Sequence, residues 1–346
     1  MAALKDILIE QIQREGPISV EQYMRQCLYH PEYGYYKARN PLGAAGDFTT
    51  APEISQMFGE MISIWLQDLW GRAGAPDSFS LIEIGPGQGT LMHDILRVAS
   101  KDFMAAADIH LVDVNPVLIA AQREKLSHYN ITWHEDVKSA LQDKTTFVVC
   151  NELFDALPIQ QYINQNGAWT ERLIEVQNNQ LCFQSDASEI REECADAIQL
   201  MQSLSDHLAE HSGAGLFIDY GYCANETGDT FQALKDHRFQ DVLQDPGNCD
   251  LTAHVNFGAL KKQAKTSGCV EFGLTTQRNF LIELGIETRA DMLSMKANSA
   301  QASDIKSALK RLINVSEMGE LFKVLAVTSP DLPIPSGFAR CIPQNR

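Results

Sequence analysis

The sequence is short of positive charge and has no cysteine arrangement typical of a zinc ribbon or a disulfide framework. Lys and Arg number 28 against 45 Asp and Glu, so the net charge is −17. Such a field repels phosphate backbones and anionic lipid head groups, which argues against nucleic acid or a membrane as partner and favours a cationic one. The eight cysteines are scattered without a Cys-x-x-Cys pair, and we expect reduced, mostly buried thiols.

Long apolar runs are also absent. No run approaches the roughly 18 residues that cross a bilayer. The first ten residues carry Asp6 and Glu10 and are poor in Arg and Ser, unlike a signal or transit peptide. We therefore expect a cytoplasmic protein. His207 and His211 are spaced like a metal pair, but the chain offers no evident third ligand, so we expect no metal site.

From residue 80 onward, short apolar strands alternate with helical segments. Helices are predicted at 90–99 and 116–126, and strands at 80–84, 109–112, 131–133, 146–150, 215–218, 270–275 and 321–326. This order predicts an α/β, Rossmann-like fold whose parallel sheet carries a site at the carboxyl ends of its strands.

Two levels of organisation are expected. Residues 1–75 predict an N-terminal layer of helices at 2–14, 19–29 and 53–70, with a long loop before the last. Residues 76–346 predict the core, interrupted at about 160–212 and 222–268. The first insertion combines an antiparallel meander over 160–184 with a helix at about 190–211.

A glycine turn between strand and helix is the most informative local feature. Gly85, Gly87 and Gly89 follow the strand Ser80–Ile84 at alternate positions. Glycine allows positive φ and close approach of a ligand, and a helix N-terminus attracts an anion. Either a phosphate or an amino-acid carboxylate would satisfy these features, and an ordinary glycine-rich turn is the alternative.

Acidic residues at neighbouring strand ends indicate which kind of ligand the glycine turn binds. Asp113 after the second strand can accept hydrogen bonds from ribose hydroxyls. Asp136 lies after the third strand and is followed by the apolar Val137. Its carboxylate can pair with an adenine amino group. Glu83 precedes the glycines as in the methyltransferase pattern E-x-G-x-G-x-G, whereas nicotinamide or flavin nucleotide sites usually have G-x-G-x-x-G. The set favours S-adenosylmethionine (SAM).

The fourth strand end supplies candidate groups for a methyl acceptor. Asn151, Glu152 and Asp155 follow it, and the two acids would share one face of a helical turn. Paired carboxylates suit a guanidinium or amine, although they could simply cap the next helix. His254 is expected in the first turn of a helix opened by Asp250 or Thr252, as a general base or as a structural residue.

Several longer motifs resemble the MidA-like family of SAM-dependent methyltransferases, which includes a mitochondrial arginine methyltransferase that assists complex I assembly. The resemblance spans nearly the whole chain. It rests on the glycine turn and on the segments Tyr33–Tyr36, Gly46–Ser55 with Phe58–Gly59, Asn151–Pro158, Phe217–Gly221, Asp250–Phe257 and Met318–Leu325.

That resemblance implies a class I methyltransferase fold, SAM as cofactor and symmetric dimethylation of a protein arginine. It also implies that Gly46–Thr50 covers the cofactor, with Thr49 among the contacts. Two residues depart from the family pattern: Asp113 stands where Glu is expected, and Asn256 where Asp is commoner.

Two other functions stay open. The insertions could form the partner surface of a SAM-binding assembly chaperone for a respiratory or other multisubunit complex. The acids also suit a small-molecule nitrogen or another methyl acceptor. A homodimer is compatible with the sequence.

Overall fold

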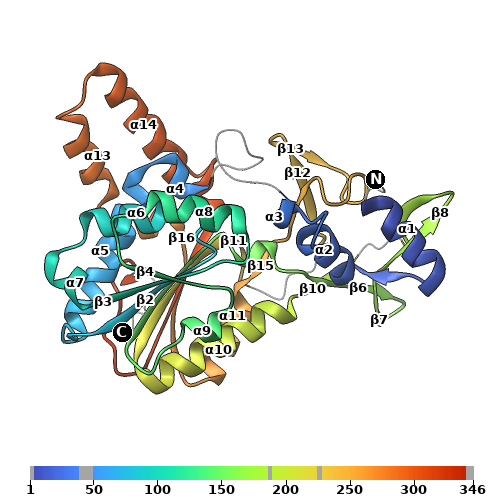
Figure 1. The fold of residues 1–346 in the computed structure, drawn as a ribbon, viewed down its shortest axis with the longest axis horizontal. Coiled ribbons are helices and arrows are strands. Elements are labelled where there is room, and N and C mark those ends of the chain that lie inside the picture. Colours follow the sequence, from blue (N-terminus) through green and yellow to red (C-terminus); the bar gives the residue numbers. More distant parts are fainter. Residues whose placement is uncertain (1–3, 39–49, 186–188, 224–227, 340–346) are drawn as a thin grey trace. The chain divides into compact units, whose positions relative to one another are not determined.

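The computed structural model describes residues 4–38, 50–185, 189–223 and 228–339. The chain divides into two compact units, which are described separately (Figure 1). The sheet unit comprises Thr49–Leu153, Leu200–Gly221 and Ala259–Arg346; the insertion unit comprises Met1–Phe48, Phe154–Gln199 and Tyr222–Gly258. None of the described helices is long and apolar enough to span a membrane.

The main path of strands in the sheet unit has the order β16-β17-β11-β5-β2-β3-β4. Their bounds are β2 (Phe79–Ile84), β3 (Ala107–Val112), β4 (Ile131–His134), β5 (Thr146–Asn151), β11 (Gly213–Tyr222), β16 (Val270–Thr276) and β17 (Phe322–Thr328). The strands from β11 to β4 are parallel, and β17 runs antiparallel to β11 and β16. Because β2 has β3 on one side and β5 on the other, strand order reverses there, which is where such sheets bind ligands.

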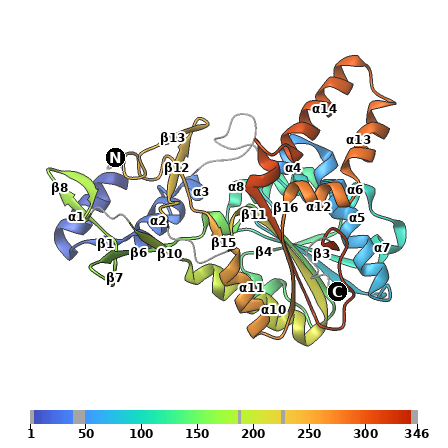
Figure 2. The same ribbon diagram turned by 180° about the vertical axis from the view of Figure 1, so that it is seen from behind.

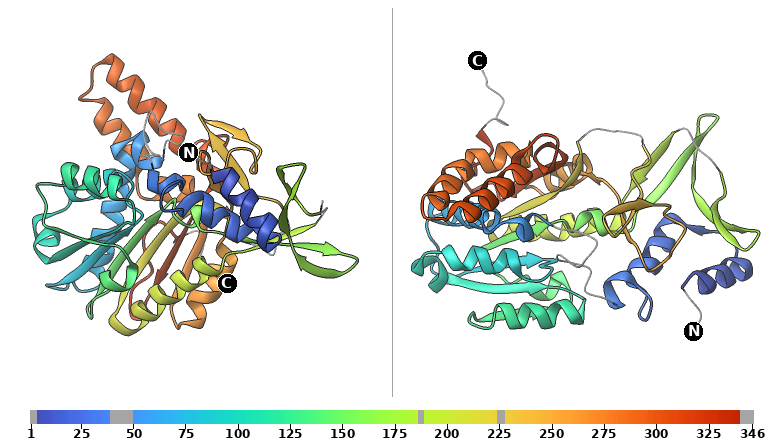
Figure 3. Two further views of the ribbon diagram at one scale, coloured as in Figure 1. Left: turned by 45° about the vertical axis from the view of Figure 1, so that its right-hand side comes forward. Right: turned by 90° about the horizontal axis from the view of Figure 1, so that it is seen from above.

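Helices cover both faces of this sheet (Figures 1 and 3). They are α5 (Gln56–Arg72), α6 (Thr90–Val98), α7 (Lys101–Ala106), α8 (Pro116–Lys125), α9 (Val137–Ala140), α10 (Ala195–His211) and α11 (Phe257–Thr266). Leu81, Leu111 and Val149 belong to one buried cluster with residues of α5 and α6. On the other face, α10 is attached to β5 by a 2.9 Å hydrogen bond between His207 Nε2 and Thr146 Oγ1.

The helix predicted at 53–70 is interrupted. A short helix, α4 (Ala51–Ile54), precedes α5, and Ser55 between them has an extended backbone. The Ser55 side chain accepts a hydrogen bond from the Met57 N–H and so acts as the N-cap of α5. The local capping preference of serine therefore overrides the longer apolar periodicity.

The segment between β16 and β17 is helical and was not covered by a sequence prediction. It contains α12 (Gln277–Glu283), α13 (Ile286–Ser294), α14 (Ser299–Ile313) and α15 (Met318–Leu321). Figure 2 shows α13 and α14 running side by side. Asn298 and Gln301 form a capping box at the start of α14.

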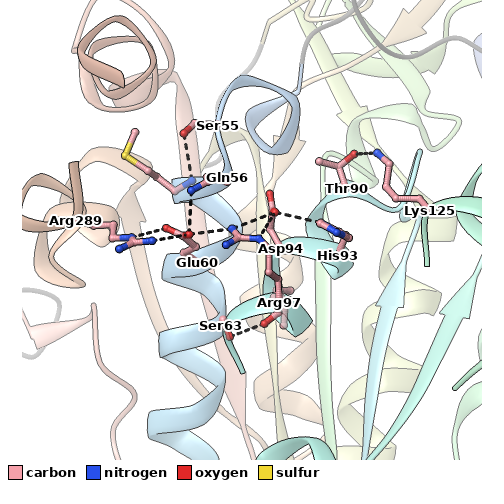
Figure 4. A network of polar contacts seen from close by, with 12 residues as sticks. Ser55, Gln56, Glu60, Ser63, Thr90, His93, Asp94, Arg97, Lys125 and Arg289 are labelled. Atoms are coloured by element: carbon pink, nitrogen blue, oxygen red, sulfur yellow. Dashed lines mark hydrogen bonds and ion pairs between the residues drawn. The ribbon is translucent and has the colours of Figure 1, made fainter. Parts of the chain in front are cut away.

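Glu60 joins three helices of the sheet unit (Figure 4). Its carboxylate accepts two hydrogen bonds from Arg289 of α13, at 2.7 and 2.9 Å, and one from Arg97 of α6 at 2.9 Å. The Glu60 side chain is only 3% exposed. Burial raises its pKa, but the two guanidinium groups outweigh burial and lower the pKa overall. Glu60 therefore ties α13 to α5 and α6.

The insertion unit combines short helices with small antiparallel sheets. Its helices are α1 (Leu4–Glu15), α2 (Val20–Tyr29), α3 (Tyr35–Ala38) and the 3-10 turn η1 (Phe154–Ala156). Its strands are β1 (Ile18–Ser19), β6 (Gln160–Gln165), β7 (Ala168–Glu171), β8 (Leu173–Gln177), β9 (Gln180–Phe183), β10 (Ile190–Glu193), β12 (Gln232–Lys235), β13 (Arg238–Gln240), β14 (Asp250–Thr252) and β15 (Val255–Asn256). Leu8, Tyr23, Leu28 and Ile174 are fully buried in its core.

The division of the chain differs from the predicted one. The predicted N-terminal layer of residues 1–75 is split, because residues 1–48 group with the insertions whereas α5 belongs to the sheet unit. The meander over 160–184 forms, but its strands join two sheets, β10-β6-β7 and β1-β8-β9. The helix predicted from about 190 begins at Ala195, because residues 190–193 pair with β6 instead.

We predict that Glu60→Gln lowers the free energy of unfolding by about 2 kcal/mol, because two partly buried guanidinium groups lose their carboxylate. Since the folded-state pKa of Glu60 is lowered, the stabilisation is present above the ordinary pKa and is lost as pH falls through the lowered value. Urea unfolding at pH 7 and pH 3.5 measures both effects. Glu15→Gln, in an exposed pair with Arg14, is the matched control and should change stability by less than about 0.5 kcal/mol. Equal effects of the two substitutions would contradict the role given to Glu60.

Candidate active site

The glycine turn lies between β2 and α6, beside the point where strand order reverses. Gly85, Gly87 and Gly89 have φ values of 69°, 53° and 77°, all in the left-handed region. A Cβ on Gly85 would lie 2.9 Å from Leu153 Cδ1. The turn therefore needs glycine for its backbone conformation and, at Gly85, also for space.

Two buried oxygen atoms flank this turn without hydrogen-bond donors among the described residues: Glu83 Oε2 and Asn151 Oδ1. Glu83 lies opposite Val149 in the register of β2 and β5, and Asn151 is two residues beyond Val149. Side chains two apart on a strand share a face, so Glu83 and Asn151 project from the same face of the sheet. Buried acceptors of this kind call for a donor, and an ammonium group would supply one.

The Glu83 carboxyl is strongly affected by its surroundings. Burial raises its pKa to about 8, although a hydrogen bond from the Met92 backbone N–H acts in the opposite direction. The negative charge of Asp113 raises it further. Glu83 is therefore largely protonated at neutral pH until a cation approaches it.

Asp113 follows β3 and is linked to the glycine turn through Gln122 of α8. Gln122 Nε2 donates to Asp113 Oδ2 at 2.7 Å and to the Gly87 carbonyl at 2.8 Å. Gln122 Oε1 accepts from Trp133 Nε1 at 3.1 Å. Gln122 was not among the predicted site residues, although its four-residue spacing from the buried Leu118 places both side chains on one side of α8.

Asp136 and Val137 lie at the end of β4, as the sequence predicted. Asp136 is exposed and caps α9, with Oδ1 accepting the Ser139 N–H at 2.9 Å. The Asp113 N–H donates to the His134 carbonyl at 3.0 Å, which fixes the two strand ends side by side. The predicted contact of Asp136 with adenine stays a prediction.

Glu152 has an unusual backbone for a residue with a side chain, with a φ of 51°. Its Oε1 accepts hydrogen bonds from Asn151 Nδ2 at 3.0 Å and from the Ala51 N–H at 3.1 Å. It thereby holds the first turn of α4 and orients the Asn151 carboxamide. The predicted helical turn with Glu152 and Asp155 on one face is wrong, because a left-handed residue cannot continue a helix.

In the insertion unit, Asp155 of η1 and Asp250 of β14 are each 6% exposed. Tyr36 donates its hydroxyl to Asp250 Oδ1 at 2.9 Å, and Tyr29 donates to the Ala156 carbonyl at 3.1 Å. Burial first, and then the charges of Asp250 and Asp155, raise the pKa of both tyrosines. Neither tyrosine was among the predicted site residues, and Asp250 was predicted only as a helix cap.

His254 lies outside any helix, so the predicted helix from Asp250 is wrong. Residues 250–252 form β14, which pairs with β12, and α11 begins only at Phe257. This pairing overrides the capping preference of Asp250 and Thr252. The Ala253 N–H donates to the Asp155 carbonyl at 2.9 Å, so the backbone next to His254 is attached to the backbone of Asp155.

The predicted cofactor cover at Gly46–Thr50, including Thr49, lies outside the described residues except for Thr50. Thr50 is the N-cap residue of α4.

The strand order, the glycine turn and the two buried acceptors on its flanks define a class: a Rossmann-fold, SAM-dependent methyltransferase. Residues 61–275 match the model of a family described as S-adenosyl-L-methionine-dependent methyltransferases, and the chain belongs to that family.

Relatives with curated names are similar along most of their length. "Protein arginine methyltransferase NDUFAF7, mitochondrial" of Danio rerio is 34% identical, over 92% of this chain and 85% of its own. The Xenopus tropicalis protein of that name is 32% identical, over 98% of this chain and 90% of its own. A crystal structure from Burkholderia thailandensis with bound S-adenosylhomocysteine has a TM-score of 0.83 and 26% identity, covering 98% of this chain and 95% of its own.

The cofactor is therefore SAM, and the described residues fit it. Glu83 Oε2 and Asn151 Oδ1 would accept hydrogen bonds from its ammonium group, and Asp113 would bind the ribose hydroxyls. Gly85, Gly87 and Gly89 leave room for close approach to the backbone.

We predict that Gly87→Val abolishes SAM binding, because a β-branched residue is strained at a φ of 53° and its side chain blocks approach to the turn. Isothermal titration calorimetry measures the loss. Gly74→Val is the control: Gly74 also has a positive φ, of 91°, but a Cβ there would meet nothing within 4 Å. It should lower stability and leave affinity unchanged. An unchanged affinity of Gly87→Val would refute this placement of the cofactor.

We predict that Glu83→Gln removes a pH dependence of stability in the cofactor-free protein. The wild-type carboxyl stays protonated in the folded state up to about pH 8 but ionises near its ordinary pKa when unfolded. The wild-type free energy of unfolding should therefore fall, relative to the variant, as pH rises from 4.5 to 8. Urea unfolding across this range measures the difference.

Cofactor binding gives the complementary result. A cation beside Glu83 lowers its pKa, so binding of S-adenosylhomocysteine at pH 7 should release close to one proton in the wild type. Calorimetry in buffers of different ionisation enthalpy counts that proton. The Glu83→Gln variant should release none; equal release by both proteins would contradict the role of Glu83.

Proposed function

We propose that this protein transfers methyl groups from SAM to arginine side chains of a protein substrate. The observation that most directly supports this proposal is a pair of buried carboxylates, Asp155 and Asp250, beside Tyr29 and Tyr36 in the insertion unit. Buried carboxylates bind a planar guanidinium well, since each can accept two hydrogen bonds from it. The curated relatives carry the name of a protein arginine methyltransferase, which supports the same acceptor.

Methyl transfer from SAM needs little covalent participation by the protein. SAM supplies an activated methyl group on its sulfonium. The acceptor nitrogen forms a C–N bond as the C–S bond breaks, S-adenosylhomocysteine leaves, and the nitrogen loses one proton. We assign Asp155 to grip the guanidinium and localise its lone pair, and His254 to accept the proton. Asn151 would align the reacting groups, with its carboxamide oriented by Glu152.

The proposal extends to the role of the net charge, the cellular location and the product. A net charge of −17 attracts a cationic protein segment and repels nucleic acid and anionic membranes. We propose a cytoplasmic enzyme whose product is symmetric dimethylarginine, as the family resemblance implies. A homodimer is compatible with this activity.

Methyl transfer can be tested with labelled SAM and a cell extract from a strain that lacks this protein. We predict label in protein, recovered as symmetric dimethylarginine after hydrolysis. Asp155→Asn should lower the rate on the order of 100-fold with SAM affinity unchanged, because it removes the charge that grips the guanidinium. Asp143→Asn is the matched control, since the Asp143 side chain is 97% exposed.

Other outcomes separate the alternatives. Label in a small molecule instead of protein would replace the proposed acceptor. Full complementation of a deletion strain by Asp155→Asn, with transfer lost, would make partner binding the main role and favour the assembly chaperone.

A further inference from the structure

A second buried polar group of the insertion unit takes no part in the chemistry above. Glu192 of β10 is 5% exposed. Its Oε1 accepts hydrogen bonds from the Thr230 N–H at 3.0 Å and from Gln161 Nε2 at 2.7 Å, and its Oε2 accepts the Thr230 hydroxyl. A buried carboxylate is costly unless donors surround it, and here three donors do so.

The hydrogen bond to Glu192 fixes the orientation of the Thr230 hydroxyl. Because its hydrogen is directed to Glu192, its oxygen is left to accept, and it accepts the backbone N–H of His254 at 2.9 Å. The preceding N–H, that of Ala253, donates to the Asp155 carbonyl at 2.9 Å. The backbone N–H groups of Ala253 and of His254, the candidate base, are thus held by two different segments of the chain.

The residues that hold Glu192 in place are themselves held by further contacts. Gln161 is fully buried, and its Oε1 accepts from Arg172 Nη1 at 2.9 Å. Arg172 also pairs with Asp229 Oδ2 at 2.8 Å, and its guanidinium lies 3.5 Å from the centre of the Phe183 ring. A framework of this kind holds Glu192 in one position, so the Thr230 hydroxyl cannot easily turn away from it.

We infer that Thr230 and Glu192 are positioning residues for methyl transfer, which hold the His254 backbone so that its imidazole meets the acceptor nitrogen. This inference rests on the proposed function. Small displacements of a proton acceptor weaken catalysis strongly, so fixing one backbone N–H has a measurable effect on rate.

The test is a double-mutant cycle measured with labelled SAM and an arginine-containing protein substrate. Thr230→Val keeps the shape and removes the hydroxyl; it should lower kcat roughly tenfold and leave KM and SAM affinity near the wild-type values. Thr230→Ser should restore kcat to within about twofold. In a His254→Ala background, Thr230→Val should have no further effect, because the residue it positions is gone.

Thr170→Val is the matched control, because Thr170 is an exposed residue of β7 in the same unit. It should not change kcat. Thr230→Ala, which removes the same hydroxyl without a new methyl group, is measured alongside in case the valine variant does not fold. A tenfold loss that persists in the His254→Ala background, or full activity of Thr230→Val, would overturn the inference.

Hydrogen exchange gives a readout that does not depend on turnover. A peptide spanning 251–257 should exchange faster in Thr230→Val than in the wild type, because the His254 amide loses its acceptor. Unchanged exchange would overturn the inference. If the wild type modifies no arginine, the proposed function fails, and exchange still decides whether Thr230 holds the amide.

Discussion

Buried hydrogen-bond acceptors that lack donors are the constraint on which the cofactor site depends. Glu83 Oε2 and Asn151 Oδ1 sit at the carboxyl ends of adjacent strands, where an apolar sheet gives them no donor among the described residues. Leaving such groups unpaired costs free energy, and burial already raises the pKa of Glu83 to about 8. A ligand that supplies a cationic donor removes this cost, and for this reason we expect ligand binding and the protonation of Glu83 to be coupled.

The two units differ in the kinds of polar side chain that they bury. The sheet unit supplies the glycine turn, the buried acceptors and Asp113, all of which suit a cofactor with an amino-acid end and a ribose. The insertion unit supplies buried carboxylates, tyrosines and His254, which suit a cationic acceptor and its proton. In the proposed function, the acceptor residues come from the insertion unit and not from the sheet that many methyltransferases share.

Sequence patterns predicted the parts of the fold that depend on local signals. The glycine turn, the parallel strands and Glu83 follow from periodicity and spacing within a few residues. Tyr36 and Thr230 could not be predicted in this way, because their partners lie far off in the chain: Tyr36 and Asp250 are 214 residues apart. The helix expected at His254 was wrong because pairing of β14 with β12 outweighs a local capping signal.

The most direct test of the account is a crystal structure with bound S-adenosylhomocysteine. We predict that the ligand's ammonium group lies within hydrogen-bond distance of Glu83 Oε2 and Asn151 Oδ1, and that its ribose hydroxyls bind the Asp113 carboxylate. A ligand whose ammonium group is bound elsewhere, with both buried oxygens still lacking donors, would contradict the central claim that these acceptors define the cofactor site.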